Sequence, residues 1–417
     1  MIQVSKRDYC GFIQKCRIHD LLHDLAIKKA REENFLVVFP KVDGARRLAI
    51  HDTGPSGELM ASAVSNMRSL WCRGEVPNIS QFTRLKVLSS CDSDDNVYEP
   101  DKFGRLSLLR YVEVALEVCE EDEDYFGKFI GGMRFLQTLD LKEMDDYDLP
   151  DCVWNIKTLR HVLLPRGSLG PPPKIYLTNL QTLIGVKARE SWVAHGPPEL
   201  SNVKNLEMFV PKAQGGVQWN AIVTLLNTMK YLTVLHLEGP DIPSKIIDMR
   251  HFPFRCRLTH LDLFDTNRGD EDEEQRAQPL NHIVLDVGML PKYLIKLTLW
   301  NIEFSRDPFP VLEKLENLRY LHLVCSRLLL RLCCSARGFG KLEDLELSGV
   351  EEWEIEEGAM PMLKNLKVCN CPGLRVLLGL QYLAVLQNLY WLDNETSGTE
   401  EHEIRSICKH VPNFYIR

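Results

Sequence analysis

The sequence predicts an α/β solenoid, in which short parallel strands stack into a curved, horseshoe-like sheet with an irregular or helical convex side. A leucine phrase, L-x-x-L-x-L, returns about every 21 to 27 residues over most of the chain. One such unit is too short to bury its own leucines, so neighbouring units must stack. The 417 residues are 45% hydrophobic and 26% charged, which is ordinary for a chain that folds. Because each repeat packs only on its neighbours, this length needs no second globular core.

The phrase can be followed from repeat to repeat. Its clearest copies begin at Leu136, Leu232, Leu258, Leu294, Leu318 and Leu342. Weaker copies begin at Leu85, Leu109, Leu159, Leu180, Leu206, Leu363 and Leu389, with degenerate ones at Ala45 and Met67. The mean spacing is about 25 residues, inside the 20 to 29 of leucine-rich repeats. We therefore predict a leucine-rich-repeat domain of about 15 irregular repeats over residues 41–417.

Residues 1–40 lack the phrase and form a separate predicted domain. An apolar stripe at helical spacing predicts a helix over residues 18–33, carried by Ile18, Leu21, Leu22 and Leu25. Two short apolar stretches before it, at 2–4 and 12–14, predict a hairpin like the wing of a winged-helix unit. Such a unit needs two further helices in front, so we expect residues 1–40 to be the C-terminal part of a winged-helix domain.

Charge and hydropathy narrow the classes of partner. The net charge is −8 and the sequence pI about 5.9, and no long run of Lys or Arg offsets it, so we expect no nucleic-acid partner. The N-terminus lacks the apolar segment of a secretory signal, and no apolar run approaches the ~18 residues of a spanning helix. The sequence predicts a cytoplasmic protein without a membrane span.

Cysteines and acidic runs have mainly structural interpretations. Thirteen scattered cysteines, with Cys72, Cys91 and Cys369 at small apolar positions of the repeat, favour core packing over disulfides, and their spacing predicts no structural metal. Acidic runs lie between repeats, at 120–124, 145–148, 270–274 and 351–357. They are either solvated loops or an electrostatic handle for a basic partner.

The densest cluster of reactive side chains is Arg17–Asp24. Helical spacing puts His19 and His23 on one face with Asp20 between them, as in the H-E-x-x-H helices of zinc hydrolases. This enzyme hypothesis is weak, because Asp is one methylene shorter than the usual base and a solenoid provides no catalytic cleft. We expect no catalytic residue and no metal.

The same segment resembles a known family. The stretch CRIHDLLHDLAIKKAREENF, residues 16–35, is similar to the end of the winged-helix domain of plant coiled-coil-class nucleotide-binding leucine-rich-repeat (NLR) disease resistance proteins. The triplet Ile18-His19-Asp20 matches that family's "MHD" motif with Ile in place of Met. Members continue directly into irregular repeats, as this chain does at residues 45–50. The resemblance covers almost the whole chain.

The resemblance implies a nucleotide-linked role for two residues. In the family, the motif's His lies against the phosphates of bound ADP and its Asp stabilises the resting state, which assigns cofactor contacts to His19 and Asp20. However, G-x-x-x-x-G-K-[ST] occurs nowhere in this sequence. We therefore expect no cofactor here, with ADP or ATP bound only if a nucleotide-binding domain is supplied elsewhere.

The repeat array is the predicted functional surface. The third and fifth positions of the phrase point away from the leucine core, and stacking aligns them in columns on the concave side. Aromatic residues there bury much area at low entropic cost when a partner binds. The predicted protein-binding residues are Tyr111, His161, His236, His260, Tyr320, His322 and Trp391, with Phe264 and Trp300 just beyond their strands; Met208 and Lys296 occupy the same columns.

These observations predict a non-enzymatic interaction module. The resemblance implies plant defence, with the array recognising pathogen effectors or guarded host proteins and holding the nucleotide-binding domain of a fuller receptor in its off state. A leucine-rich substrate adaptor of a ubiquitin ligase is the alternative binding protein, although the first 40 residues do not resemble an F-box. The zinc hydrolase is the alternative enzyme.

Overall fold

A computed structural model describes residues 2–7, 13–18, 20–32, 37–38, 46–50, 66–73, 82–91, 106–115, 130, 132–144, 148–212, 217–266, 283–329, 331–371, 374, 379–392 and 404–416. The chain divides into two compact units, Met1–Phe209 and Val210–Arg417. The predicted boundary near residue 40 does not coincide with this division and stays a prediction.

The first unit begins with a hairpin and a helix. Strands β1 (Ile2–Arg7) and β2 (Ile13–Ile18) pair antiparallel, and α1 spans Asp20–Glu32. The predicted hairpin and helix are therefore confirmed, the helix within two residues at each end. Their assignment to a winged-helix domain stays a prediction.

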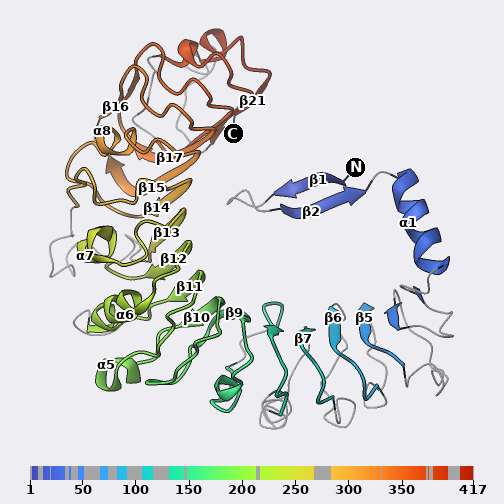
Figure 1. Ribbon diagram of the computed structural model, residues 1–417. Helices are drawn as coiled ribbons and strands as arrows, with labels where there is room; N and C mark the ends of the chain where they lie inside the picture. Colours follow the sequence, from blue (N-terminus) through green and yellow to red (C-terminus); the bar gives the residue numbers. More distant parts are fainter. Residues whose placement is uncertain are drawn as a thin grey trace. The chain divides into compact units, whose positions relative to one another are not determined.

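A parallel sheet built in sequence order makes up the rest of the first unit (Figure 1). Each repeat contributes one strand, and consecutive strands are paired in register over the leucine phrase. The strands are β3 (Val37–Val38), β4 (Arg47–Ile50), β5 (Ser69–Arg73), β6 (Val87–Cys91), β7 (Tyr111–Val114), β8 (Thr138–Asp140), β9 (His161–Leu169), β10 (Thr182–Lys187) and β11 (Asn205–Phe209). The connections between these strands contain η3 (Val153–Asn155) and α5 (Ser191–His195).

The second unit repeats this arrangement. Its parallel sheet comprises β12 (Val234–Gly239), β13 (His260–Asp265), β14 (Lys296–Trp300), β15 (Tyr320–Leu329), β17 (Asp344–Val350), β19 (Asn365–Cys369), β20 (Asn388–Leu392) and β21 (Asn413–Ile416). A separate parallel pair is formed by β16 (Leu332–Cys334) and β18 (Trp353–Ile355). The connections contain α6 (Val217–Thr228), α7 (Ser244–Ile247), α8 (Phe309–Leu312), η5 (Met249–His251) and η7 (Leu380–Tyr382).

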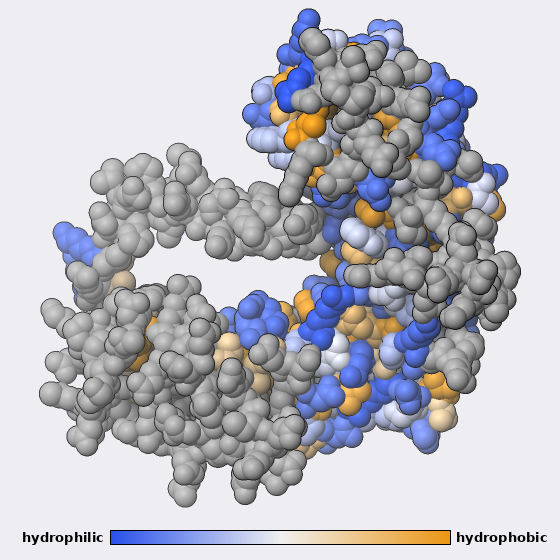
Figure 2. Space-filling model, turned by 180° about the vertical axis from the view of Figure 1, so that it is seen from behind, coloured by the Kyte–Doolittle hydropathy of each residue, from blue (hydrophilic) through white to orange (hydrophobic). Residues whose placement is uncertain are grey.

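The leucines of the phrase form the core. Burial alternates along the strands, and Leu235 and Leu237 of β12 are fully buried between partly exposed neighbours. Leu139 and Leu141 are likewise fully buried in the first unit, although Asp140 between them is also buried. On the face shown in Figure 2, the coloured surface is mostly hydrophilic, with hydrophobic residues in scattered patches. The predicted parallel leucine-rich-repeat sheet is confirmed.

Two repeats start three residues earlier than predicted, and several strands, among them β21, were not predicted. In register, Leu183 faces Leu206 and Leu366 faces Leu389, so Leu206 and Leu389 are the second leucines of their phrases. The first positions are Val203 and Leu386, both buried. Strand β21 escaped prediction because its core positions hold Phe414 and Ile416 rather than leucine.

A glycine allows the first sheet to bulge. The register of β10 shifts between Leu183 and Val186 against both neighbouring strands. Gly185 lies in this step with φ +86°, and a Cβ there would lie 2.1 Å from the Leu164 carbonyl oxygen. Only glycine fits this backbone without displacing β9.

Cysteines and acidic runs follow the predictions only in part. Cys72 is buried, and burial raises the pKa of its thiol to about 12. Cys369 is only partly buried, because it aligns with Ser348 on the outward face. The acidic run at 351–357 is not a simple loop, since Glu354 belongs to β18. The runs at 120–124 and 270–274, and residues 145–147 of another, lie outside the described residues.

Candidate functional site

The candidate site is the outward face of the sheet in the second unit. Side chains at the third and fifth positions of the phrase point outward from this face and line up in two columns, as predicted. The third-position column holds Val234, His260, Lys296, Tyr320, Asp344, Asn365, Asn388 and Asn413. The fifth-position column holds His236, Asp262, Thr298, His322, Glu346, Lys367, Tyr390 and Tyr415.

An aromatic row crosses the first three strands of this face. The His236 ring lies 4.9 Å from the Phe264 ring, and Phe264 stacks on Trp300 with centroids 5.7 Å apart. The Trp300 side chain remains 44% exposed. Because neighbouring strands repeat at about 4.8 Å, in-register rings stack and leave their edges available to a partner.

A buried ion pair lies beside the aromatic row. The Lys296 ammonium is 2.9 Å and 3.2 Å from the two carboxylate oxygens of Asp262, and both side chains are more than nine-tenths buried. The pair is diagonal, because Asp262 is in register with Thr298 and Lys296 with His260. Charges buried this deeply hold a single geometry, since separating them would leave an uncompensated charge.

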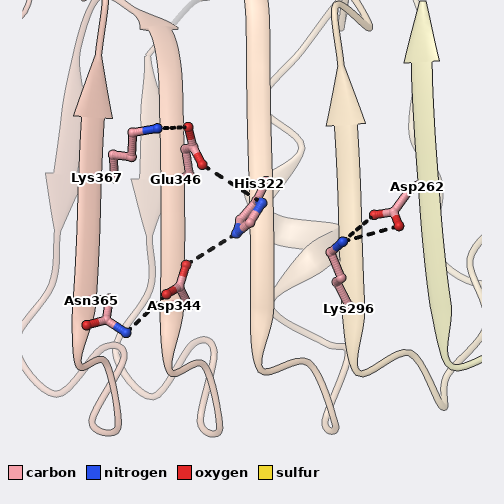
Figure 3. Close-up of polar contacts among 7 residues, drawn as sticks. All are labelled: Asp262, Lys296, His322, Asp344, Glu346, Asn365 and Lys367. Carbon is pink, nitrogen blue, oxygen red and sulfur yellow. Dashed lines mark hydrogen bonds and ion pairs between the residues drawn. The ribbon is translucent and has the colours of Figure 1, made fainter. Parts of the chain in front are cut away.

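A second group of polar contacts continues across the next strands (Figure 3). His322 lies between two carboxylates, with Nε2 3.2 Å from Asp344 and Nδ1 3.9 Å from Glu346. Lys367 donates to Glu346 at 2.7 Å, and Asn365 donates to Asp344 at 3.1 Å. These five side chains therefore link β15, β17 and β19 on the outward face.

An amide ladder extends this group to the last strand. Asn388 donates through Nδ2 to Oδ1 of Asn365 at 2.7 Å, and Asn413 donates in the same way to Asn388 at 2.9 Å. In the neighbouring column, Tyr390 and Tyr415 stack with centroids 4.8 Å apart and planes 8° apart. Each side chain is held by the next, which reduces the entropy lost when a partner binds.

The outward face of the first unit carries shorter groups. Tyr111 and Ser89 donate hydroxyl hydrogen bonds to Glu113 at 2.9 Å and 2.8 Å. Burial raises the pKa of the neighbouring Asp140, and the charge of Glu113 adds to this while Lys142 opposes it. On later strands, His161 Nδ1 lies 3.0 Å from the Thr182 hydroxyl, and the Arg166 guanidinium lies over the Phe209 ring at 4.9 Å.

Only some of the predicted binding residues lie together in the structure. Phe264 lies against both His236 and Trp300, and His322 belongs to the polar group beside Tyr320. Tyr111 and His161 lie in the other unit, partly buried. His260 faces outward but is 8% exposed, between its column neighbours Val234 and Lys296.

Two predicted outward residues face the core instead. Trp391 is fully buried, because the corrected repeat start puts it at the sixth, inward position, paired with Val368. Met208 is fully buried for the same reason. Tyr390 and Glu207 take the outward positions that the prediction gave to Trp391 and Met208.

The cofactor residues implied by the resemblance are not tested. His19 lies outside the described residues, and Asp20 begins α1, where its side chain is not described. Within the described part of the chain, no three His, Cys, Asp or Glu side chains are grouped as metal ligands. No helix among the same residues is long and apolar enough to cross a membrane.

The charged and amide residues of the face were missed by sequence reasoning, which looked for aromatic anchors. Asp262, Asp344, Glu346, Asn365 and Lys367 occupy the same two columns as the predicted residues. Their outward position could have been predicted from the sequence, because the repeat phase alone assigns each of them to this face. Their hydrogen bonds depend on side-chain geometry, which the phase does not give.

Comparison with known proteins agrees with this architecture. A family model described as a leucine-rich repeat region matches residues 66–412. A solved leucine-rich-repeat protein of Leptospira interrogans has the same fold, with a TM-score of 0.54 at 18% identity, covering 94% of this chain and 98% of that one. The chain belongs to the leucine-rich-repeat family.

Its relatives by sequence are plant disease resistance proteins. Disease resistance protein RPP13 of Arabidopsis thaliana is 29% identical over 375 residues, which is 86% of this chain and 40% of RPP13. The probable disease resistance protein RXW24L of the same plant is 26% identical over 97% of this chain and 46% of its own length. The ToMV susceptible protein tm-2 of Solanum lycopersicum is 28% identical over 88% and 44%. The chain spans less than half the length of these relatives, and its resemblance to the leucine-rich-repeat part of such proteins is confirmed.

Proposed function

We propose that the chain is the protein-binding module of a plant disease resistance protein, and that the outward face of its second unit recognises a pathogen effector or a guarded host protein. The aromatic row of His236, Phe264 and Trp300, next to the buried pair of Asp262 and Lys296, carries this proposal. Exposed aromatic side chains beside rigid polar groups are the usual composition of an interface hot spot.

The physical case rests on preorganisation. The rings are stacked before a partner arrives, and the contacts from His322 to Asn413 fix the polar side chains beside them. A partner then orders few side chains on this surface, so more of the contact energy appears as affinity. Binding without catalysis is what such a surface supports, and names of the relatives speak of resistance rather than of a reaction.

Two further parts of the proposal follow from the resemblance. The nucleotide-binding domain of a fuller receptor would be a second partner, with this chain contributing to the off state. The place of action would be the cytoplasm. Both are independent of which face binds the first partner.

The test replaces three aromatic side chains of this face and follows partners in plant cells. The variant Phe264→Ala/Trp300→Ala/Tyr320→Ala removes three rings from the face, whereas Tyr176→Ala/Tyr231→Ala/Tyr382→Ala removes three exposed rings elsewhere. Proximity labelling followed by direct binding of the purified partner should give the same partners for wild type and control. We expect the face variant to lose at least one of them, with affinity falling at least about tenfold, since a hot-spot ring contributes about 2 kcal/mol.

The control keeps this result interpretable. Both triple variants remove aromatic area from the surface, so a general loss of solubility or folding would affect them alike. If the face variant keeps every partner at wild-type affinity, the outward face of the second unit is not the recognition surface.

A further inference from the structure

The second position of the leucine phrase forms a basic rim along the first unit. In the eight repeats that begin at residues 45, 67, 85, 109, 136, 159, 180 and 203, this position holds Arg46, Arg68, Lys86, Arg110, Gln137, Arg160, Gln181 and Lys204. Their backbones are adjacent: the Arg68 amide donates to the Arg46 carbonyl at 2.8 Å, and the same bond recurs at each step to Lys204. A cation thus directly precedes six of these eight neighbouring strands.

Residues just before the phrase strengthen this rim. The two positions ahead of each start from 85 to 203 add Arg84, Arg134 and Lys157, all exposed. At these positions and at the second position of the eight repeats, the described residues include no Asp or Glu. These cations are dispersed at the repeat period, so the search for a long run of Lys or Arg did not reveal them.

Two exposed apolar side chains interrupt the rim on adjacent strands. Leu108 and Phe135 directly precede the first leucines of neighbouring repeats and are 37% and 50% exposed. Arg110 and Gln137, two residues further along each strand, are joined by a backbone hydrogen bond of 2.8 Å. Apolar residues set among cations are typical of proteins that lie at a membrane interface.

A neighbouring histidine, His161, lies within the positive potential of the rim. The pKa of His161 lies below its ordinary value of 6.5, mainly because of burial and then because of the charges of Arg160 and Lys204. Two cations of the rim are therefore close enough to disfavour a third positive charge.

We propose that this basic rim, Arg46 to Lys204 with Arg84, Arg134 and Lys157, binds the surface of an anionic phospholipid membrane, with Leu108 and Phe135 entering the headgroup region. In-register pairing holds the second positions at one level along the strands, so seven strand spacings of about 4.8 Å give a row about 34 Å long. Lipid headgroups diffuse laterally and can match this fixed spacing, whereas a protein partner would need an equally long row of carboxylates.

A membrane surface also explains both kinds of side chain in the rim. Anionic headgroups attract a cluster of four to eight basic residues, each contributing through the surface potential. Guanidinium groups, six of the nine cations, suit the phosphate oxygens because of their bidentate geometry. A nucleic-acid backbone would satisfy the cations but offers no apolar layer for Leu108 and Phe135.

The test measures sedimentation of the purified full chain with vesicles of phosphatidylcholine, alone or mixed with phosphatidylserine. We expect binding only to the mixed vesicles, and less of it as salt rises. The variant Arg84→Gln/Arg110→Gln/Arg160→Gln should reduce the partition coefficient on the order of 100-fold, given the contribution per basic residue near such a surface. Phe135→Ser should weaken binding and leave its salt dependence unchanged.

The matched control is Lys28→Gln/Lys174→Gln/Lys314→Gln, which removes the same charge from exposed positions outside the rim. It should bind mixed vesicles as wild type does. The proposal is overturned if wild type ignores mixed vesicles or if both triple variants bind alike. It is also overturned if single-stranded DNA or poly-glutamate, rather than vesicles, shows the rim-dependent binding. None of these variants changes the outward face of the second unit. Failure of the membrane proposal would therefore leave the proposed protein binding unaffected.

Discussion

The two units use the second position of the same phrase in different ways. In the first unit it holds six cations and no acid, whereas in the second it holds Thr233, Thr259, Ile295, Arg319, Glu343, Lys364 and Gln387. There, Glu343 accepts from Lys364 at 2.7 Å and from Arg319 at 2.5 Å, so the charges compensate each other within the rim. The leucines fix the scaffold equally in both units, and the positions between them are free to make different surfaces.

The outward faces of the two units also differ in how their side chains are connected. The second unit joins side chains from β15 through β21 by successive hydrogen bonds, whereas on the first unit's face Tyr111 and Ser89 both donate to Glu113. These successive hydrogen bonds hold the side chains of the second face in one arrangement. Rigid faces suit recognition of a shaped partner, whereas a row of long cationic side chains suits a deformable one.

Of the substitutions proposed, breaking the buried ion pair of the second unit should lower the unfolding free energy most. Asp262→Ala removes the carboxylate that lies 2.9 Å from the Lys296 ammonium, at a site that is more than nine-tenths buried. We expect a loss of about 3–5 kcal/mol in unfolding free energy, measured by chemical denaturation. The double variant Asp262→Leu/Lys296→Met removes both charges and should cost much less, and equal losses for the two variants would contradict the role of the pair.

The second-largest destabilisation is expected from a substitution at the bulge of the first unit's sheet. Gly185→Ala places a methyl group against the Leu164 carbonyl in a backbone region that disfavours any side chain. We expect destabilisation of about 2–3 kcal/mol, with protection from hydrogen exchange lost first in β9 and β10. Gly167→Ala is the matched control, since its φ is +90° but no atom lies within 4 Å of the added methyl group. A similar loss for both would assign the effect to backbone conformation rather than to the close approach.

The amide ladder should contribute less. Asn388→Ala removes one donated and one accepted hydrogen bond on a partly exposed surface. We expect a loss of about 1–2 kcal/mol in unfolding free energy. Asn413→Ala removes only one of these bonds and should cost about half as much. If Asn388→Ala has no effect, the ladder does not rigidify the second face.

The compensated rim of the second unit should give the smallest effect. The hydrogen bond from Lys364 holds the pKa of Glu343 below its ordinary value of 4.5, with a smaller contribution from Arg319. This stabilisation is present above pH 4.5 and is lost as the pH falls through the lowered pKa. Glu343→Gln should therefore cost less than about 1 kcal/mol at neutral pH, because the site is solvent-screened. The difference from wild type should disappear under acid conditions, which a pH series of denaturation curves would check.

Much of the fold could be predicted because it depends on periodic leucines. The start at Leu232 predicted that Leu235 and Leu237 would be buried, and they are. At Leu206 and Leu389 the prediction failed, because Val203 and Leu386 begin those phrases and any leucine can be mistaken for the first one. Burial of Trp391 follows from that three-residue shift.

The candidate site was less predictable for a different reason. The aromatic contact of Phe264 with Trp300 follows from their equivalent positions on adjacent strands. The position of His322 between Asp344 and Glu346 depends on rotamers, which a column assignment does not specify. The basic rim was hidden because its second-position cations recur at the repeat period, so they do not form a run in the sequence.

Hydroxyl-radical footprinting of the native chain tests most directly which side chains face outward and which face the core. Oxidation rates read side-chain exposure residue by residue without any substitution. We predict fast modification of Trp300, Phe135 and Tyr415, and protection of Trp391, Trp154 and Trp192. Modification of Trp391 as fast as that of Trp300 would contradict the repeat phase on which both proposed surfaces depend.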